Sequence, residues 1–151
     1  MAVYFEDLPV GFTEKFGRYE VTRDEVLAFA RAYDPQPFHL DDAAAAASPV
    51  FGRLAASGWH TGSMAMRMIV DHWSDQQLAS MGAAGLDELV WLKPVYPGDV
   101  LRLEAEILEA RTSAKRPGMG FLKVRTVTYN QHDEPVMRQV ANLMIGRRPA
   151  E

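Results

Sequence analysis

The chain has 151 residues, of which 48% are hydrophobic and 24% are charged, and its formal net charge is −4. This length suits one domain with a substantial core, and the composition is ordinary for a globular protein. The acidic balance argues against nucleic-acid binding, because nucleic-acid-binding proteins usually carry a basic stripe. No segment approaches the roughly 20 apolar residues that span a bilayer, so we expect no membrane insertion.

The absence of cysteine excludes disulfides, thiolate nucleophiles and thiolate metal sites. Residues 1–7, Met-Ala-Val-Tyr-Phe-Glu-Asp, have neither the basic segment nor the apolar run of an export signal. We therefore expect a cytoplasmic protein.

The first third of the chain reads as a short strand followed by a capped helix. Phe12–Tyr19 is a possible strand. Thr22 and Glu25 have the spacing of a capping box, in which the Thr side chain accepts from a backbone N–H and the Glu side chain reaches back. The helix that they begin is expected to end at Asp34, because Pro35 disfavours helical backbone in the residue before it.

A short helix and a long helix are expected next. Asp41 is a plausible N-cap for a helix over Ala43–Ala47. A second helical run, Trp59–Trp73, is apolar around most of its circumference, and such a helix is expected to be buried. One face of it carries Trp59, Met66, Val70 and Trp73. Residues 74–85 read as a less ordered connection.

From Leu86 onward, apolar residues recur with the period of two that is typical of strands. The expected strands are Leu86–Tyr96, Val100–Ala110, Gly120–Asn130 and Val136–Gly146. Short connections between successive strands predict an antiparallel meander. With the helices first and the long strands last, the pattern predicts a single α+β domain over residues 1–151, in which a strongly curved antiparallel sheet wraps around the long helix.

The stretch from Tyr33 to His39, Tyr-Asp-Pro-Gln-Pro-Phe-His, places a carboxylate and an imidazole on a segment that prolines stiffen. A stiff irregular segment suits a site that holds an acid and a base in register. From the residues alone, the alternative is that Asp34 only ends a helix and that His39 is structural.

Asp34-Pro35-Gln36-Pro37-Phe38-His39 resembles the Asp-x-Asn-Pro-x-His hydratase motif of MaoC-like dehydratases and R-specific enoyl-CoA hydratases, which have the hotdog fold. Further segments are similar to that family in the same order: Ala55–Gly58 before the long helix, Tyr96–Asp99 between strands, Arg111–Lys115, and a last strand that ends in Arg147-Arg148. Two residues depart from the family pattern. Gln36 stands where Asn is usual, and Tyr33 stands where Gly is common.

The resemblance implies a hydratase or dehydratase acting reversibly on an enoyl or 3-hydroxyacyl thioester linked to coenzyme A, with no other cofactor. It implies that Asp34 and His39 share the acid–base work through one bound water. The backbone N–H of Gly58, at the start of the long helix, is expected to polarise the thioester carbonyl. The residues expected to bind the substrate or its oxyanion are Gly58, Ser57, Gln36, Tyr33, His60 and Trp59.

Several of these residues have a second interpretation. Ser57 is more often a helix cap than a substrate contact at such a position. Tyr33 either narrows the pocket or packs into the core, and His60 either contacts substrate or packs at the helix start. Burial is expected to raise the pKa of Asp34.

Two alternatives to a hydratase stay open: a hotdog acyl-CoA thioesterase and a non-catalytic acyl-thioester-binding module. The Asp-to-His spacing favours hydration. We expect no metal site, because Asp41 and Asp42 near His39 are explained by helix capping. We expect a homodimer or a dimer-based higher oligomer, by resemblance and because a curved sheet leaves unpaired edge strands. Lys115, Arg116, Arg147 and Arg148 could meet phosphates of coenzyme A, without an assigned role.

Overall fold

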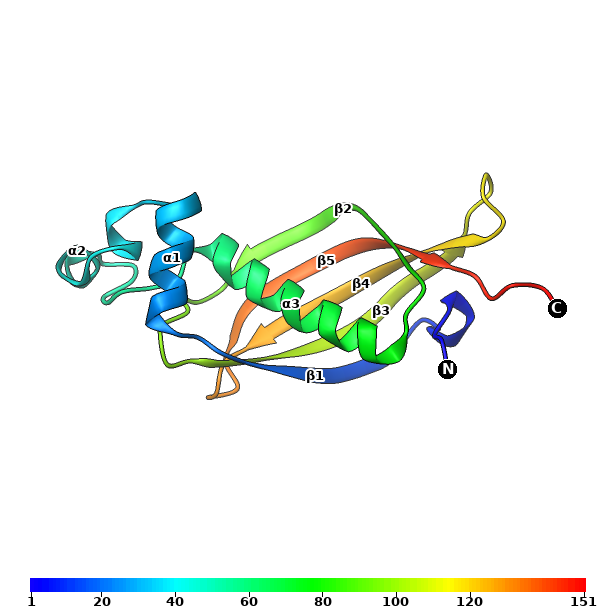
Figure 1. Cartoon of the computed structure of the whole chain (residues 1–151), viewed down its shortest axis with the longest axis horizontal. Coiled ribbons are helices and arrows are strands. Elements are labelled where there is room, and N and C mark those ends of the chain that lie inside the picture. Colours follow the sequence, from blue (N-terminus) through cyan, green and yellow to red (C-terminus); the bar gives the residue numbers. More distant parts are fainter.

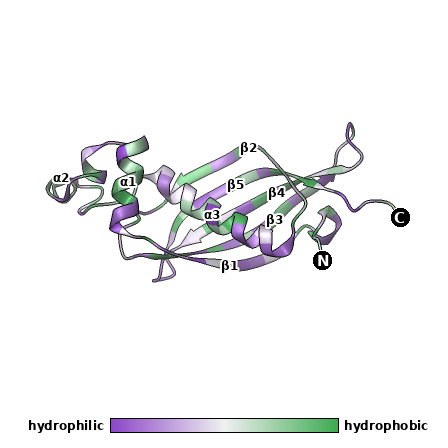
Figure 2. Ribbon diagram, in the orientation of Figure 1, coloured by the Kyte–Doolittle hydropathy of each residue, from purple (hydrophilic) through white to green (hydrophobic).

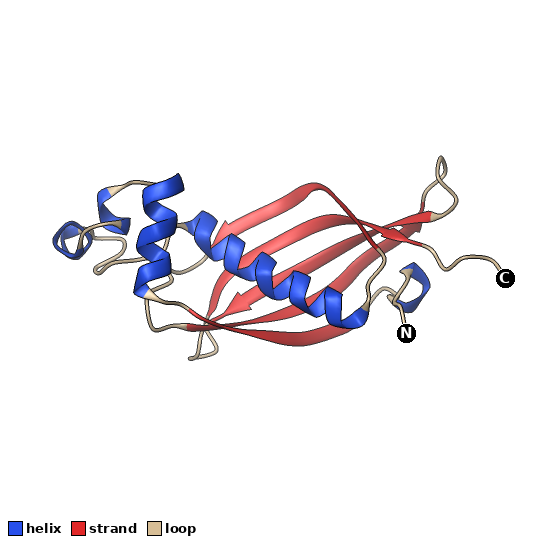
Figure 3. Ribbon diagram, viewed as in Figure 1, coloured by secondary structure: helices blue, strands red, loops and turns tan.

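A long helix lies across one face of a five-stranded antiparallel sheet in the computed structural model, which describes residues 1–151 (Figures 1 and 3). The elements in chain order are η1 (Phe5–Asp7), β1 (Thr13–Glu20), α1 (Arg23–Tyr33), η2 (Pro37–His39), α2 (Asp42–Ala47), α3 (Gly58–Gln76), β2 (Ser80–Trp91), β3 (Val100–Thr112), β4 (Met119–Tyr129) and β5 (Pro135–Gly146). Both α1 and α2 lie at the end of the molecule where α3 begins, and the two chain termini lie at the other end (Figure 1). The predicted α+β class is confirmed.

The strand order in the sheet is β1-β3-β4-β5-β2. Strands β3, β4 and β5 form the predicted meander, but β2 pairs with β5 rather than with β3. The prediction of a four-strand meander is therefore wrong for the first of the four. The segment from β2 to β3 crosses the end of the sheet. Hydrophobic periodicity along the chain does not specify which strand β2 pairs with.

The segment after α3 is more ordered than its sequence predicts. The helix continues to Gln76, and β2 begins at Ser80, so the expected loop over residues 74–85 is mostly helix and strand. Two glycines with positive φ, Gly82 and Gly85, interrupt the apolar alternation there, and the pairing with β5 shifts register nearby. β-Bulges at glycines hide a strand from a period-two reading.

The capped helices follow their sequence signals closely. The Thr22 hydroxyl accepts from the backbone N–H of Glu25 at 3.3 Å, as predicted. The Glu25 carboxylate does not return this bond and instead accepts from the Tyr19 hydroxyl at 2.5 Å. Asp41 caps α2 by accepting from the backbone N–H of Ala44. At the start of α1, only the Thr22 half of the predicted capping box is therefore formed.

A glycine in β1 lets the sheet close around α3. Gly17 has φ of +86°, and the pairing of β1 with β3 is irregular between Phe16 and Tyr19. A Cβ at this position would lie 2.7 Å from the sulfur of Met68 on α3. Glycine here permits both the left-handed backbone and the close approach of the helix.

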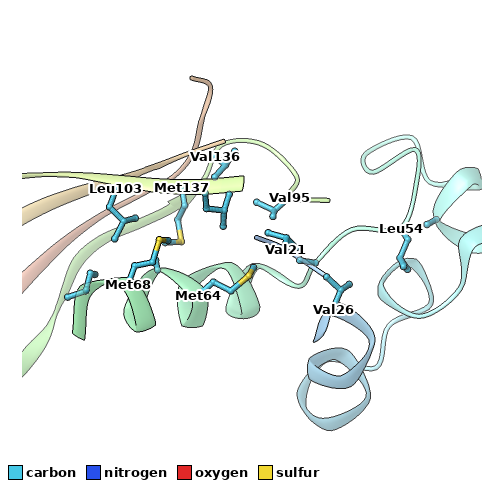
Figure 4. Close-up of a cluster of buried hydrophobic side chains, with 14 residues drawn as sticks. Val21, Val26, Leu54, Met64, Met68, Val95, Leu103, Val136 and Met137 are labelled. Atoms are coloured by element: carbon cyan, nitrogen blue, oxygen red, sulfur yellow. The ribbon is translucent and has the colours of Figure 1, made fainter. Parts of the chain in front are cut away.

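The core lies between α3 and the concave face of the sheet, where green, hydrophobic stretches of both face one another (Figure 2). In this cluster Met68 of α3 extends toward Met137 of β5, while Met64, also of α3, lies beside Val21; Leu103 of β3 belongs to the same cluster (Figure 4). All five side chains are at most 4% exposed. Methionine fills irregular gaps, which suits a helix packed on a curved surface.

The outer face of α3 is not covered within one chain. Trp59 is 61% exposed, Met66 43% and Val70 46%, although the apolar sequence of the helix predicted cover on most sides. On β2, the edge strand, Met81, Leu86 and Trp91 are also exposed. No helix is both long enough and apolar enough to cross a membrane.

We expect Leu103→Ala to lower the free energy of unfolding by about 2–5 kcal/mol, because Leu103 is fully buried against α3 and its removal leaves a cavity. Urea denaturation measures the change. Val10→Ala, at a side chain that is 61% exposed, should change it by less than about 0.5 kcal/mol. Similar values for both variants would contradict this location of the core.

Candidate active site

A pocket of about 350 Å³ opens where α3 begins. Its walls come from the segment after α1, from the loop before α3, from the first turn of α3, and from the end of β2 with the residues that follow it. The lining residues are Asp34, His39, Val50, Phe51, Ala56, Gly58, Trp59, Thr61, Trp91, Leu92, Lys93, Pro94 and Val95. The pocket thus contains the predicted acid, imidazole and helix-start glycine.

Asp34 and His39 face each other across this pocket. Helix α1 ends at Asp34, whose backbone N–H still donates to the carbonyl of Ala30. The 3₁₀ turn Pro37–His39 then brings the imidazole back, so that His39 Nε2 lies 3.4 Å from Asp34 Oδ2. The His39 residue is only 3% exposed. Two prolines and a single 3₁₀ turn therefore fix the spacing that the sequence predicted.

The hydrogen bond on the far side of the imidazole fixes its tautomer. His39 Nδ1 lies 2.7 Å from the carbonyl oxygen of Ala55. A carbonyl only accepts, so Nδ1 carries the hydrogen and, in the neutral ring, Nε2 presents a lone pair toward Asp34. Two acceptors, Nε2 and Oδ2, thus border the same small space.

Asp34 is held ionised by its neighbours. Burial acts to raise the pKa of the Asp34 carboxyl, but the nearby Ser57 hydroxyl and the Gln36 amide outweigh it, as does the positive charge of His39 when the imidazole is protonated, and the net pKa is lowered. Gln36 Nε2 donates to Asp34 Oδ1 at 2.7 Å. The expectation that burial would raise this pKa is wrong, because it left out these donors.

Ser57 occupies the N-cap position of α3, but its side chain makes no capping hydrogen bond. The expectation that it caps the helix is therefore wrong. Its hydroxyl is completely buried and lies near enough to Asp34 to lower the pKa of that carboxyl, yet it has no partner at ordinary hydrogen-bond geometry. Ser57 is not among the residues that line the pocket.

The first two backbone N–H groups of α3 are free. His60 and Thr61 both donate to the carbonyl of Ser57, whereas neither Gly58 nor Trp59 donates to a backbone or side-chain acceptor. Both residues line the pocket. Unpaired N–H groups at the positive end of a helix favour an acceptor that carries negative charge.

Four predicted site residues are not among those that line the pocket: Ser57, Gln36, Tyr33 and His60. The Tyr33 side chain is 78% exposed and stacks at a tilt on Phe29, so it neither narrows the pocket nor enters the core. His60 is 5% exposed, and its ring also stacks on Phe29, with 4.8 Å between the two ring centroids. Burial lowers the pKa of His60. Its packing interpretation fits the structure better than substrate contact.

The wall formed by the end of β2 was not predicted from the sequence. Trp91 and the residues after it belong to an ordinary strand and loop in the sequence, and only the β2–β5 pairing brings them to the start of α3. None of the four cations considered for phosphate contact lines the pocket, and they lie in the turn between β3 and β4 and after the end of β5. Arg147 pairs with Glu6 and Arg148 with Asp7.

Comparison with known proteins places the chain in a family. Residues 10–129 match the MaoC-like domain. The chain belongs to the MaoC-like domain family. A 3-hydroxybutyryl-CoA dehydratase of Methylorubrum extorquens is 31% identical over 116 residues, which cover 76% of this chain and 69% of that protein.

The MaoC-like chain also resembles solved structures along its whole length. The crystal structure of a MaoC-like dehydratase from Rhodospirillum rubrum is 41% identical and superposes with a TM-score of 0.89, covering 98% of this chain and 99% of the other. An uncharacterized Bacillus subtilis protein, YdeM, is 28% identical over 94% of this chain and 98% of its own. The hotdog fold expected from the sequence is therefore confirmed for this MaoC-like domain.

We expect Gln36→Ala to raise the pKa of Asp34, because the substitution removes one of the donors that lower it. Carbon NMR of the labelled carboxyl group measures the shift. Because the pKa of Asp34 is lower in the folded chain than in the unfolded chain, its ionised form stabilises the fold at pH values above the unfolded-state pKa. This stabilisation is lost as the pH falls through the folded-state pKa. The variant should lose less stability over that acid range.

Gln131→Ala is the matched control, because Gln131 donates to another carboxylate, Asp99, at 2.9 Å. It should leave the titration of Asp34 unchanged. An unaltered pKa for Asp34 in Gln36→Ala would mean that the Gln36 amide does not set the charge of the site.

Proposed function

We propose that this MaoC-like protein reversibly adds water to an enoyl thioester of coenzyme A, giving a 3-hydroxyacyl thioester. The single observation that carries the proposal is the pair of acceptors, Asp34 Oδ2 and His39 Nε2, held 3.4 Å apart in a pocket that also contains free backbone N–H groups. The similarity to a 3-hydroxybutyryl-CoA dehydratase supports the same reaction class.

The acceptor pair suits the activation of one water. A water between Asp34 and His39 would donate one hydrogen to each, which leaves its oxygen lone pair directed at the β-carbon of the substrate. As the new C–O bond forms, the pair takes the proton that the water loses. The same pair then supplies a proton to the α-carbon, so that H and OH are added across the double bond.

The free N–H groups of Gly58 and Trp59 suit the developing negative charge. Attack at the β-carbon moves electrons through the conjugated system onto the thioester oxygen. An oxygen that accepts from these N–H groups would be stabilised by two fixed dipoles and by the positive end of α3. The pocket thus has one group of residues for water and another for the enolate.

The proposal requires no cofactor beyond the coenzyme A carried by the substrate. Hydration changes no overall oxidation state, and the proton transfers stay within the Asp34–His39 pair. Gln36 replaces the more usual Asn of the motif and still donates its amide to Asp34. This replacement is consistent with an intact hydration site.

We expect Asp34→Asn and His39→Ala each to lower the rate of hydration roughly 10²- to 10⁴-fold, the range for loss of a general acid or base. Crotonyl-CoA and octenoyl-CoA are suitable substrates. Loss of enoyl absorbance reports hydration, and release of free thiol reports thioester hydrolysis.

His132→Ala, in the turn before β5, is the control for loss of a histidine outside the pocket and should keep full activity. Thiol release that depends on Asp34 would make the protein a thioesterase instead. Absence of both signals over a broad acyl panel would favour an acyl-thioester-binding module.

We also propose that the protein forms a homodimer through the exposed seam between α3 and β2. Trp59 and Trp91 meet edge to face in this seam, and Met66 and Leu86 together line an apolar hollow of about 220 Å³ further along it. β2 is an edge strand with a free pairing side. A second copy that covers this apolar surface would border the pocket.

We expect the wild-type protein to sediment as a dimer and Val70→Lys to sediment as a monomer, because Val70 is 46% exposed on the outer face of α3 and a charge there opposes burial. Val10→Lys is the control at another exposed valine and should stay dimeric. A monomeric wild-type protein would contradict the proposed interface.

A further inference from the structure

Trp91, the last residue of β2, holds the first turn of α3. Its indole Nε1–H donates to the carbonyl oxygen of Gly58 at 2.9 Å. The Trp91 ring also meets the Trp59 ring edge to face, with 5.2 Å between centroids and 82° between planes. A strand end and a helix start are thus joined by one side chain at the wall of the pocket.

The contact requires glycine at position 58. A Cβ on Gly58 would lie 2.5 Å from indole carbon Cε2 of Trp91 and 2.8 Å from the indole nitrogen. One turn later, a Cβ on Gly62 would meet nothing within 4 Å. Gly58 does not have a positive φ, so close approach of the ring, rather than backbone conformation, is what demands glycine here.

Together with the helical backbone of α3, the indole also restrains a peptide group that carries a free N–H. The carbonyl of Gly58 and the N–H of Trp59 belong to the same planar trans peptide and point in opposite directions. Fixing the carbonyl against Trp91 therefore fixes the Trp59 N–H, which has no acceptor within the chain. A hydrogen bond to the carbonyl of a peptide also polarises its N–H and makes it a stronger donor.

A second bond anchors the same segment on its other side. The backbone N–H of Ala56 donates to the carbonyl of Val95 at 2.8 Å, and the carbonyl of Ala55 accepts from His39. The segment Ala55–Gly58 is thus attached to the sheet end through Val95 and Trp91 and to the imidazole through Ala55. These attachments set the N–H groups of α3 relative to His39.

We propose that Trp91 is a positioning residue that aims the Trp59 N–H, and with it the oxyanion-binding start of α3, at the thioester carbonyl. The role rests on the hydration reaction proposed above. Trp91 touches neither Asp34 nor His39 by a hydrogen bond. It acts on the enolate side of the reaction alone.

Trp91→Phe keeps a smaller aromatic ring beside Gly58 and removes the N–H donor. We expect kcat for crotonyl-CoA hydration to fall about 10- to 100-fold, less than the roughly 10²- to 10³-fold loss of a whole oxyanion donor. KM should change little, since the donor acts mainly in the transition state. The pH profile should keep its shape, because Asp34 and His39 keep their partners. Wild-type kcat in this variant would overturn the proposal.

Two glycines on the same helix provide a matched comparison. Gly58→Ala must displace the Trp91 ring and should lower kcat, whereas Gly62→Ala should leave kcat unchanged. In a Trp91→Ala background the ring is gone, so adding Gly58→Ala should lower kcat no further. Equal effects of Gly58→Ala in both backgrounds would show that the indole contact does not act on the site.

An NMR measurement separates this proposal from the proposed function. The backbone amide signal of Trp59 should shift in Trp91→Phe and stay in place in Gly62→Ala, with denaturation curves confirming that both variants fold. If wild-type protein hydrates no enoyl thioester, the proposed function fails, but the amide signal still decides whether Trp91 orients the Trp59 N–H. An unmoved Trp59 signal in Trp91→Phe overturns that orientation.

Discussion

The arrangement of the pocket depends on the hydrogen bond between buried His39 and the carbonyl of Ala55. This bond places the hydrogen on Nδ1, so that the neutral ring offers a lone pair toward Asp34. It also ties the turn after α1 to the loop that leads into α3. The Asp34–His39 pair and the free N–H groups of the helix therefore share one anchor. Small shifts of that loop would move both together, which keeps the two halves of the proposed reaction in register.

Helix α3 serves different purposes on its different sides. Its inner side fills the concave sheet through Met64 and Met68, its first turn offers unpaired N–H groups, and its outer side stays apolar and exposed. A helix that is hydrophobic nearly all round is expected to be buried nearly all round. In one chain it is not, and the remaining apolar area faces the free edge of β2. That area is the surface through which we propose that two copies of the chain associate.

The elements whose signals are local were predictable. The Thr22 cap, the Asp41 cap and the end of α1 depend on residues a few positions apart, and the structure has them where they were expected. The spacing of Asp34 and His39 is also local, since it depends on the prolines between them. What could not be predicted depends on contacts distant in sequence. The pairing of β2 with β5 is one such contact, and it alone brings Trp91 to Gly58. The lowered pKa of Asp34 likewise depends in part on Ser57, which is distant from it in the sequence.

The two departures from the motif have opposite structural meanings. Tyr33 lies on the surface, so its replacement of glycine leaves the pocket unchanged within the chain. Gln36 remains part of the site, because its longer side chain still reaches Asp34 Oδ1 from two residues away. The oxygen that Gln36 engages is not the one that faces His39, so Oδ2 stays available for a water. The Gln36 amide therefore holds the Asp34 carboxylate in place and favours its ionised form without occupying Oδ2. Gln36 has an extended backbone between the two prolines, and from there its side chain, one methylene longer than that of Asn, still reaches Asp34.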